Sequence, residues 1–324
     1  MHSYHVYDTM SPPTTIVFGA TGGVGSAVAR TLQELGSKVV LAVRDLQKPI
    51  PGLGSEQEKA GGFERVVADL TKPETVEAAV RQTGAKHAFI YLVLGVSDGL
   101  RPTIEALKAG GIEFVVFLSS ASVHGDIRKI TPATYIPFAH AQVEIGLEEV
   151  FGTEGYVALR PAYFDTNTSW WGPGIRAGEL NIAYPEEKFD WISPEDIGRV
   201  GAAVLAKGIK STEGTKSPNS IALCGPKLLS QRDAVAVLAK AAGKDVKVVD
   251  ADEETAVQGI AAIGVPEALA RQLISEVGKR WRGEEKFAVY EKEEYAEASG
   301  NVSKYAGRST SLEEWAAKNL AVFS

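Results

Sequence analysis

Short apolar runs alternate with amphipathic stretches through the first half of this chain. The apolar runs are rich in β-branched and aromatic residues, whereas the stretches between them have helical periodicity and end near glycine, as helices often do. The predicted strands are residues 14–19, 38–43, 64–69, 87–93, 114–120 and 156–161. The predicted helices are residues 23–36, 73–84, 98–111 and 138–152. This alternation is typical of βαβ units, so it predicts an α/β Rossmann fold with a doubly wound parallel sheet.

The alternation loosens after about residue 160, where a polar segment carries proline, glycine and two adjacent tryptophans. Later helices are predicted at residues 193–208, 230–244, 266–283 and 311–323, and strands at residues 221–225 and 246–250. These elements predict a smaller C-terminal α+β cap over the carboxyl ends of the strands, where open α/β sheets bind ligands.

The same patterns predict how the chain divides into domains. We expect a flexible N-terminus at residues 1–13 and a dinucleotide-binding domain at residues 14–165. Residues from about 190 to 225 return to that domain, and residues 166–324 mainly form the substrate-binding cap.

Composition narrows the classes of partner. The 324 residues are 44% hydrophobic and carry a net charge of −7 with no long basic run, which disfavours nucleic-acid binding. The one cysteine, Cys224, allows no internal disulfide and, without neighbouring Cys or His ligands, no metal site. No signal peptide and no membrane-length apolar run are visible. We therefore expect a cytoplasmic protein that binds a small-molecule substrate and no membrane.

Three glycines point to a bound nucleotide. Gly19, Gly22 and Gly25 have the spacing G-x-x-G-x-x-G between a predicted strand and a predicted helix. In such loops the first glycine permits a tight turn, the second lets backbone amides approach phosphate, and the third lets helix and strand pack closely. Glycine-rich turns also occur without a ligand, but here strand, loop and helix follow in the required order. The same loop adds further expected cofactor contacts, namely Thr21, Gly23 and Val24.

The end of the second strand indicates which dinucleotide binds. An acidic residue there accepts a hydrogen bond from the adenosine 2′-hydroxyl, whereas an arginine accommodates a 2′-phosphate. Arg44 stands at the strand end and Lys48 follows four residues later, so NADP(H) is favoured over NAD. Asp45 argues the other way, and both cations could simply be solvated surface residues. Asp69 and Leu70, at the end of the third strand, are expected beside the adenine.

Several segments together resemble one protein family. They are GATGGVG (19–25), AVRDLQK (42–48), ADL (68–70), FLSSAS (117–122), LRPAYF (159–164) and residues 221–244. Their combination and order resemble the NmrA-like family, the atypical short-chain dehydrogenases, from about residue 14 to the C-terminal segment 311–323. The resemblance implies an NADP(H)-binding Rossmann domain and a smaller domain that closes a substrate cleft. Members include reductases of quinones and other metabolites, and regulators that bind the nucleotide without turning it over.

The chain departs from that pattern at the usual proton-transfer dyad. Reductases of this wider group commonly place a lysine on the helix after the fifth strand, with a tyrosine four residues earlier. Aligning Glu144 with the family's K-x-x-x-E spacing puts His140 at the lysine position and Ile136 at the tyrosine position, and no lysine lies between Lys129 and Lys188. A mostly neutral imidazole does not lower a phenol's pKa as an ammonium does. We expect that nucleotide binding is retained and that the dyad is lost or moved.

Polar and aromatic residues near the predicted strand ends are the candidates for a moved site. The catalytic candidates are Tyr135, His140 and Ser120. Further expected cofactor contacts are Tyr91, Leu92, Ser119, His140, Pro161, Tyr163 and Phe164. The expected substrate contacts are His124, Tyr135, Phe138, Trp170 and Trp171. Each side chain alone has a simpler explanation as a packed aromatic, a capping hydroxyl or a surface histidine, but convergence at strand ends strengthens the set.

Three functions fit this sequence. The first is an NADPH-dependent reductase of a small cyclic or aromatic metabolite, such as a quinone, an enone or an imine or iminium, because polarised substrates need little acid assistance. The second is a non-catalytic NADP(H) sensor whose occupancy changes its affinity for a protein partner. The third is a cyclase or isomerase of secondary metabolism that uses bound NADP(H).

Overall fold

The computed structural model describes residues 12–213 and 217–324, and these residues form two compact units. The first unit comprises the described part of Met1–Ser119 together with Asp126–Leu159 and Gly198–Ile221. The second comprises Ser120–Gly125, Arg160–Ile197 and Ala222–Ser324. Most of the predicted flexible N-terminus, residues 1–11, lies outside the described residues. That the second unit caps the sheet stays a prediction.

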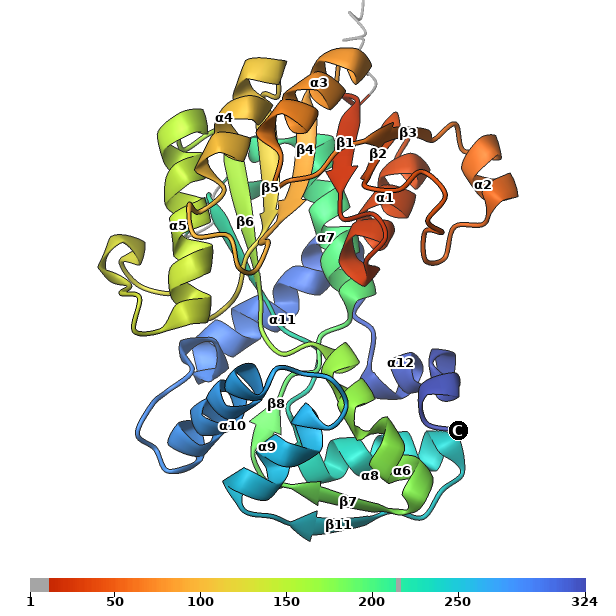
Figure 1. Cartoon of the computed structure of the whole chain (residues 1–324), viewed down its shortest axis with the longest axis vertical. Coiled ribbons are helices and arrows are strands. Elements are labelled where there is room, and N and C mark those ends of the chain that lie inside the picture. The colour runs from red at the N-terminus through yellow and green to blue at the C-terminus, as the bar shows by residue number, and fades with distance from the viewer. Residues whose placement is uncertain (1–11, 214–216) are drawn as a thin grey trace, which may run out of the picture. The chain divides into compact units, whose positions relative to one another are not determined.

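A seven-stranded sheet is built by the residues that the structure describes, with the order β3-β2-β1-β4-β5-β6-β9 (Figure 1). The strands are β1 (Thr15–Phe18), β2 (Val39–Val43), β3 (Glu64–Val67), β4 (His87–Tyr91), β5 (Phe114–Leu118), β6 (Tyr156–Pro161) and β9 (Ser220–Leu223). The pairs from β3 to β6 are parallel. The strand order reverses between β1 and β4, which creates the switch point where doubly wound sheets bind ligands. The predicted α/β Rossmann fold is confirmed.

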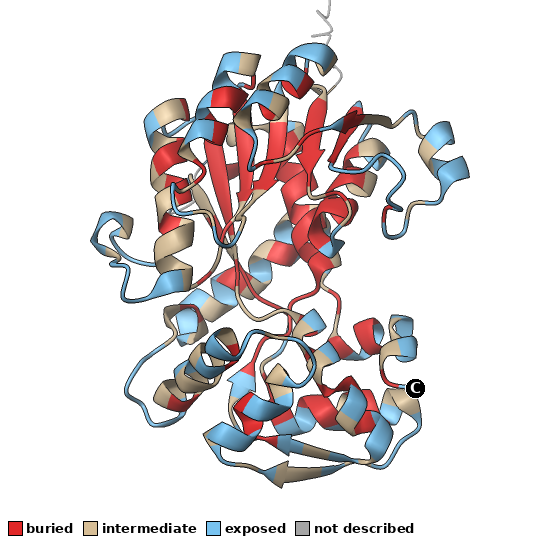
Figure 2. Cartoon of the chain, in the orientation of Figure 1, coloured by how far each residue is buried: buried red, intermediate tan, exposed pale blue. Residues whose placement is uncertain are grey.

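Helices cover both faces of this sheet. They are α1 (Gly23–Glu34), α3 (Pro73–Thr83), α4 (Arg101–Gly110), α5 (Tyr135–Phe151) and α7 (Pro194–Lys207), whereas the short helix α2 (Ser55–Ala60) buries no residue. Apolar residues of α3, α4 and α5 share one buried cluster with alternate residues of the strands. On the other face α7 packs closely on α1, because a Cβ at Gly198 would lie only 2.4 Å from the Ala27 Cβ. Figure 2 shows strands β1, β2, β4 and β5 as almost entirely buried.

Helix α5 begins at Tyr135, three residues before the predicted start at residue 138. Pro137 lies within its first turn. Proline is tolerated there because the first amides of a helix have no intrahelical partner to lose. The correction matters because it puts Tyr135 at the beginning of the helix that carries His140.

The second unit is a mixture of short strands and helices. Its regular elements are η2 (Asp165–Trp171), α6 (Gly172–Ala177), β7 (Glu179–Ile182), β8 (Lys188–Phe189), β10 (Leu229–Ser230), α8 (Gln231–Ala242), β11 (Lys247–Asp250), α9 (Glu253–Ala261), α10 (Glu267–Trp281), η4 (Ala288–Tyr290), α11 (Lys292–Ala306), α12 (Leu312–Lys318) and η5 (Leu320–Val322). Strands β7 and β11 pair in parallel, and β8 pairs with β10 antiparallel. A separate core of aromatic and aliphatic side chains, including Trp171, Trp191 and Trp315, holds the unit together.

Across the described residues, no helix combines the length and the apolar character that a membrane span requires.

Candidate functional site

The loop between β1 and α1 is shaped by two of its glycines. Gly19 has φ +73°, and a Cβ there would lie 2.7 Å from Cε1 of Tyr91. A Cβ at Gly25 would lie 2.2 Å from the Gly19 carbonyl oxygen. Any side chain at either position would therefore displace backbone or a packed ring. Gly22 is less restricted, since its Cβ would meet only the Gly19 oxygen at 3.4 Å.

The loop also presents backbone amides at the start of a helix. The Gly22 amide donates to the Gly19 carbonyl at 2.9 Å, which closes the turn, and the Ser26 amide donates to the Gly22 carbonyl at 3.0 Å. Gly23 begins α1, so the amides of its first turn have no acceptor within the helix. Together with the helix dipole, such amides form a site for a phosphate group.

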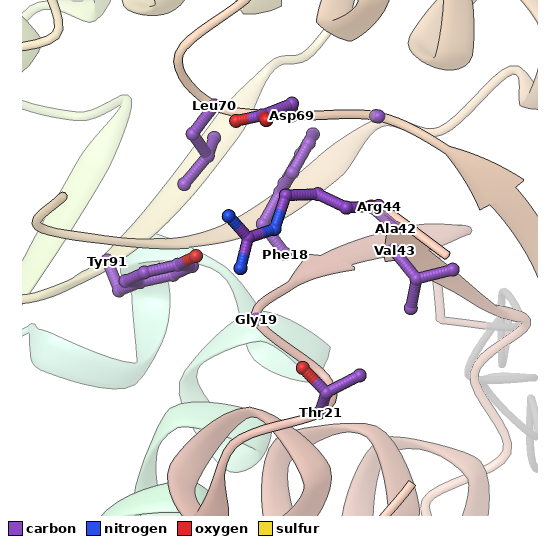
Figure 3. Close-up of a pocket in the computed structure, with 10 residues that line it drawn as sticks. Phe18, Gly19, Thr21, Ala42, Val43, Arg44, Asp69, Leu70 and Tyr91 are labelled. Atoms are coloured by element: carbon purple, nitrogen blue, oxygen red, sulfur yellow. The ribbon is translucent and has the colours of Figure 1, made fainter. Parts of the chain in front are cut away.

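A pocket opens beside this loop at the carboxyl ends of β1 to β4 (Figure 3). Its lining consists of Phe18, Gly19, Thr21, Ala42, Val43, Arg44, Ala68, Asp69, Leu70 and Tyr91. The guanidinium group of Arg44 extends into it toward Tyr91 and Asp69. The structure thus brings together six of the residues predicted to contact the cofactor: Gly19, Thr21, Arg44, Asp69, Leu70 and Tyr91.

The charges at the pocket rim are well defined. Partial burial raises the pKa of Asp69, but hydrogen bonds from the Thr71 amide and hydroxyl and the positive charge of Arg44 outweigh it, so the net shift is downward. Burial raises the pKa of Tyr91, with Arg44 opposing that shift. At neutral pH the rim therefore holds a carboxylate, a guanidinium cation and a neutral phenol.

Asp45 and Lys48 follow Arg44 in an exposed turn and do not line the pocket. Asp45 Oδ1 accepts a hydrogen bond from the Gln47 amide at 2.9 Å, and the Lys48 amide donates to the Asp45 carbonyl at 3.2 Å. One oxygen of the Asp45 carboxylate is thus engaged within its own turn. The predicted roles of Arg44 and Lys48 at a 2′-phosphate stay predictions.

His140 lies on α5 against the fifth strand. Its Nδ1 is 2.8 Å from the Ile136 carbonyl oxygen, and its ring centroid is 6.1 Å from that of Phe117. A carbonyl can only accept, so Nδ1 carries the proton in the neutral ring and Nε2 keeps a lone pair. Burial lowers the pKa of His140, which keeps the ring neutral at pH 7. In that state Nε2 can accept a proton but cannot supply one.

Ser119 links helix α5 to the carboxyl end of strand β5. It is buried directly after β5, and its hydroxyl donates to Glu144 Oε1 at 2.5 Å. Glu144 lies one turn after His140, so His140 belongs to the end of α5 that meets the carboxyl end of β5. The hydroxyl proton of Ser119 is committed to this structural bond, and the predicted cofactor contact of Ser119 stays a prediction.

Tyr135 is the first residue of α5 and is 46% exposed. Its hydroxyl accepts a hydrogen bond from the Gly95 amide at 3.2 Å, which ties the start of α5 to the loop after β4. Phe138, one turn later, is half-buried, as is Leu92, which directly follows β4. The catalytic and substrate roles assigned to these residues stay predictions.

The remaining candidates belong to the second unit. The hydroxyls of Ser120 and Ser122 are 2.9 Å apart, His124 is exposed, and the Pro161 carbonyl accepts from the Ala121 amide at 2.9 Å. Phe164 forms an isolated bridge with Ile192. Their roles at the cofactor and the substrate stay predictions.

Two further candidate residues, Tyr163 and Trp171, pack in an aromatic cluster of the second unit. The ring centroids of Tyr163 and Phe189 are 4.0 Å apart. The ring centroids of Trp171 and Trp191 are 5.4 Å apart in an edge-on arrangement. Burial raises the pKa of Tyr163 to about 12, so its phenol keeps its proton at neutral pH. Trp171 is buried in this core whereas Trp170 is half-buried, which makes Trp170 the better placed of the pair for the substrate contact predicted for both.

Buried carboxyl groups in the second unit were missed at the sequence level. Asp190 accepts hydrogen bonds from the Tyr163 amide, the Gly225 amide and the Tyr290 hydroxyl. Even so, complete burial raises the pKa of Asp190 to about 6. Asp165 lies nearby in the same network of charges. Asp165 begins η2 and Asp190 directly follows the two-residue strand β8, and in such short elements no periodicity marks a carboxyl group as buried.

Comparisons with known proteins agree with this architecture. The model of the NmrA-like family matches residues 12–316. A nitrogen metabolite regulation-like protein, bik4, of Gibberella fujikuroi is 37% identical, with 94% of this chain and 96% of that protein covered. An NAD(P)H azoreductase of Xenophilus azovorans is 29% identical, over 79% of this chain and 83% of that enzyme.

Solved structures share the fold at low sequence identity. The structure of NmrA, a negative transcriptional regulator in complex with NADP, superposes with a TM-score of 0.70 at 17% identity and covers 97% of both chains. At this identity the likeness establishes the fold alone.

Proposed function

This chain belongs to the NmrA-like family, and from that premise we propose that it binds NADP(H) and uses it to reduce a small cyclic or aromatic metabolite. The observation that carries the proposal is the pocket in which the glycine loop, Arg44 and Asp69 meet. The azoreductase among its relatives supports a reductive function for this fold.

The residues present fit the phosphorylated half of this cofactor. The loop leaves no room for a side chain at Gly19 or Gly25, and the first amides of α1 would bind the pyrophosphate. Arg44 would supply the cation for the 2′-phosphate, and Lys48 would add a second charge from the adjacent turn. Asp69 and Leu70 would lie beside the adenine.

When bound, NADPH supplies a hydride. His140, with Nδ1 held by the Ile136 carbonyl, offers only an acceptor and suits a ribose hydroxyl better than a substrate that needs a proton. Tyr135 is the better proton source, because a hydroxyl that accepts from Gly95 can still donate its own proton. Quinones, enones and imines are already polarised and need one proton donor, a role we propose for Tyr135, whereas an iminium ion needs none. We therefore propose these compounds as the substrate class.

The test is to add a panel of these three compound classes to the protein with NADPH. Turnover is measured as the loss of NADPH absorbance. We expect turnover with at least one class. We also expect Tyr135→Phe to slow an enone or quinone by about a hundredfold, at the low end of what a positioned acid contributes. An iminium ion, which gains no proton on hydride addition, should be little affected. Tyr305→Phe, on α11, is the matched control. Binding without turnover of any class contradicts the reductase proposal.

A second candidate is an NADP(H)-sensing regulator. It is favoured by the 37% identity to a regulation-like protein and by the absence of lysine at position 140. Tight NADP binding, no turnover across the panel and a protein partner whose affinity changes with nucleotide occupancy would support it.

A further inference from the structure

Arg65 holds the turn that follows Arg44. It lies on β3, and its Nη1 donates to the carbonyl oxygens of Leu46 at 2.6 Å and Lys48 at 2.9 Å. Its Nε and Nη2 donate to the two carboxylate oxygens of Glu58 at 2.5 and 2.8 Å. The side chains of Arg65 and Glu58 are only 20% and 15% exposed. One guanidinium group therefore joins β3, α2 and the turn between β2 and α2.

The Arg65–Glu58 pair fixes the backbone shape of the turn without adding net charge to it. Glu58 pairs with Arg65 in a two-pronged ion pair, so Arg65 adds little positive charge to the neighbourhood. Its two bonds to carbonyl oxygens hold the backbone on either side of Gln47. Gln47 is the residue whose amide occupies the Asp45 carboxylate. The clamp on the backbone thus supports the bond that keeps Asp45 within its own turn.

We propose that Arg65 is a positioning residue that sets the preference for a 2′-phosphorylated dinucleotide over an unphosphorylated one. The proposal rests on NADP(H) binding as argued above. With the clamp in place, one oxygen of the Asp45 carboxylate is held by the Gln47 amide, and Lys48 stands at a fixed point beyond Arg44. If the clamp is released, we expect the Asp45 carboxylate to turn toward the ribose, where it can accept from a 2′-hydroxyl and repel a 2′-phosphate. Arg44 itself sits at the end of β2, so the general binding of nucleotide should survive.

The test is calorimetric titration of the full chain with NADP and with NAD. Arg65→Met keeps the length of the side chain and removes its donors and charge. We expect the ratio of the NAD to the NADP dissociation constant to fall roughly tenfold, which corresponds to about 1.4 kcal/mol. Arg81→Met is the matched control, because Arg81 forms an exposed ion pair with Glu77 on α3, away from the turn. It should leave the ratio unchanged.

Two milder variants cover the case in which Arg65→Met does not fold. Arg65→Lys keeps the charge but can reach only part of the network, and Glu58→Asp keeps the charge of Glu58 but shortens its reach to Arg65. Both should lower the ratio by less than Arg65→Met. A folded Arg65→Met that weakens both nucleotides equally, or folded Lys and Asp variants that keep the wild-type ratio, would overturn the proposal. Failure of the wild-type chain to bind NADP would overturn the proposed function itself, and that outcome is seen before any variant is compared.

Discussion

At the scale of single residues, Asp165 is a carboxyl group whose surroundings oppose its ionisation. It is 1% exposed, and its Oδ1 has no hydrogen-bond partner among the described residues. Burial, with the neighbouring charges of Asp196 and Asp190 adding to the effect, raises the pKa of Asp165 to about 9. The folded chain therefore keeps a proton at neutral pH that the unfolded chain releases.

This difference makes a prediction about stability and pH. Below the ordinary carboxyl pKa of about 3.8 both states hold the proton, so Asp165 has no effect on pH dependence. Between that value and about 9, only the folded state holds it, and the free energy of unfolding falls as pH rises. Asp165→Asn has no proton to release, so we expect its stability advantage over wild type to grow from about pH 5 to about pH 8.

Urea unfolding at a series of pH values measures this advantage. Asp245→Asn, at an exposed aspartate of the same unit, is the control and should show no such growth. A difference between Asp165→Asn and wild type that stays constant with pH would mean that Asp165 is ionised in the folded chain.

The residue scale also marks the limit of inference from sequence. The glycine loop and Arg44 could be placed because spacing within one strand, loop and helix is local information. The sequence does not predict the hydrogen bond between Asp45 and Gln47 or the clamp by Arg65. Arg65 and Glu58 are brought to the turn by β3 and α2, which are separate elements. A charged residue on a strand of moderate burial gives no signal of the carbonyl groups it will meet.

At the scale of elements, two helical glycines have opposite surroundings. Gly300 lies in the middle of α11, where an added Cβ would meet no atom within 4 Å. Gly198 lies in α7, where a Cβ would be 2.4 Å from the Ala27 Cβ and 2.8 Å from the Val24 carbonyl oxygen. The first glycine only weakens its helix, whereas the second allows α7 to approach α1.

Alanine substitutions should separate these roles. We expect Gly300→Ala to raise the free energy of unfolding by roughly 0.5–1 kcal/mol, because alanine loses less backbone entropy in a helix. Gly198→Ala should lower it by about 1–3 kcal/mol through overpacking. Denaturant unfolding of both variants and of the wild type measures the sign of each change in the free energy of unfolding. A destabilised Gly300→Ala would indicate that α11 has a neighbour at this position that the described residues do not include.

The sequence predicts the elements that have a strong local pattern and misses those that depend on tertiary contacts. Strands β1, β2, β4 and β5 are nearly continuous apolar runs bounded by polar turns, so their positions are set by local pattern. Helix α11 was missed because its segment carries glycine and many charges, and its buried face is reduced to residues such as Ala298 and Val302. Strands β8 and β10 have two residues each and exist only through their mutual pairing. Elements of this kind depend on tertiary contacts rather than on their own periodicity.

At the scale of the whole molecule, each unit has a core of its own. Leu107, Val115 and Phe117 belong to the core of the first unit, whereas Trp191, Leu238 and Trp315 belong to that of the second. Every residue that lines the pocket beside the glycine loop belongs to the first unit. A ligand that binds there stabilises the folded state by mass action, and its direct contacts protect that unit.

This division predicts how NADP should change the stability of the chain. At a concentration of 100 times its dissociation constant, NADP should raise the free energy of unfolding by about 2.7 kcal/mol, whereas NAD at the same concentration should raise it less because it lacks the phosphate for Arg44. The double variant Arg44→Ala/Lys48→Ala should lose most of the NADP effect and keep most of the smaller NAD effect. Hydrogen exchange should slow first in residues 19–26 and 44–48, with α8 of the second unit as the internal reference. Equal stabilisation by the two nucleotides, or protection that begins in α8, would place the phosphate away from Arg44.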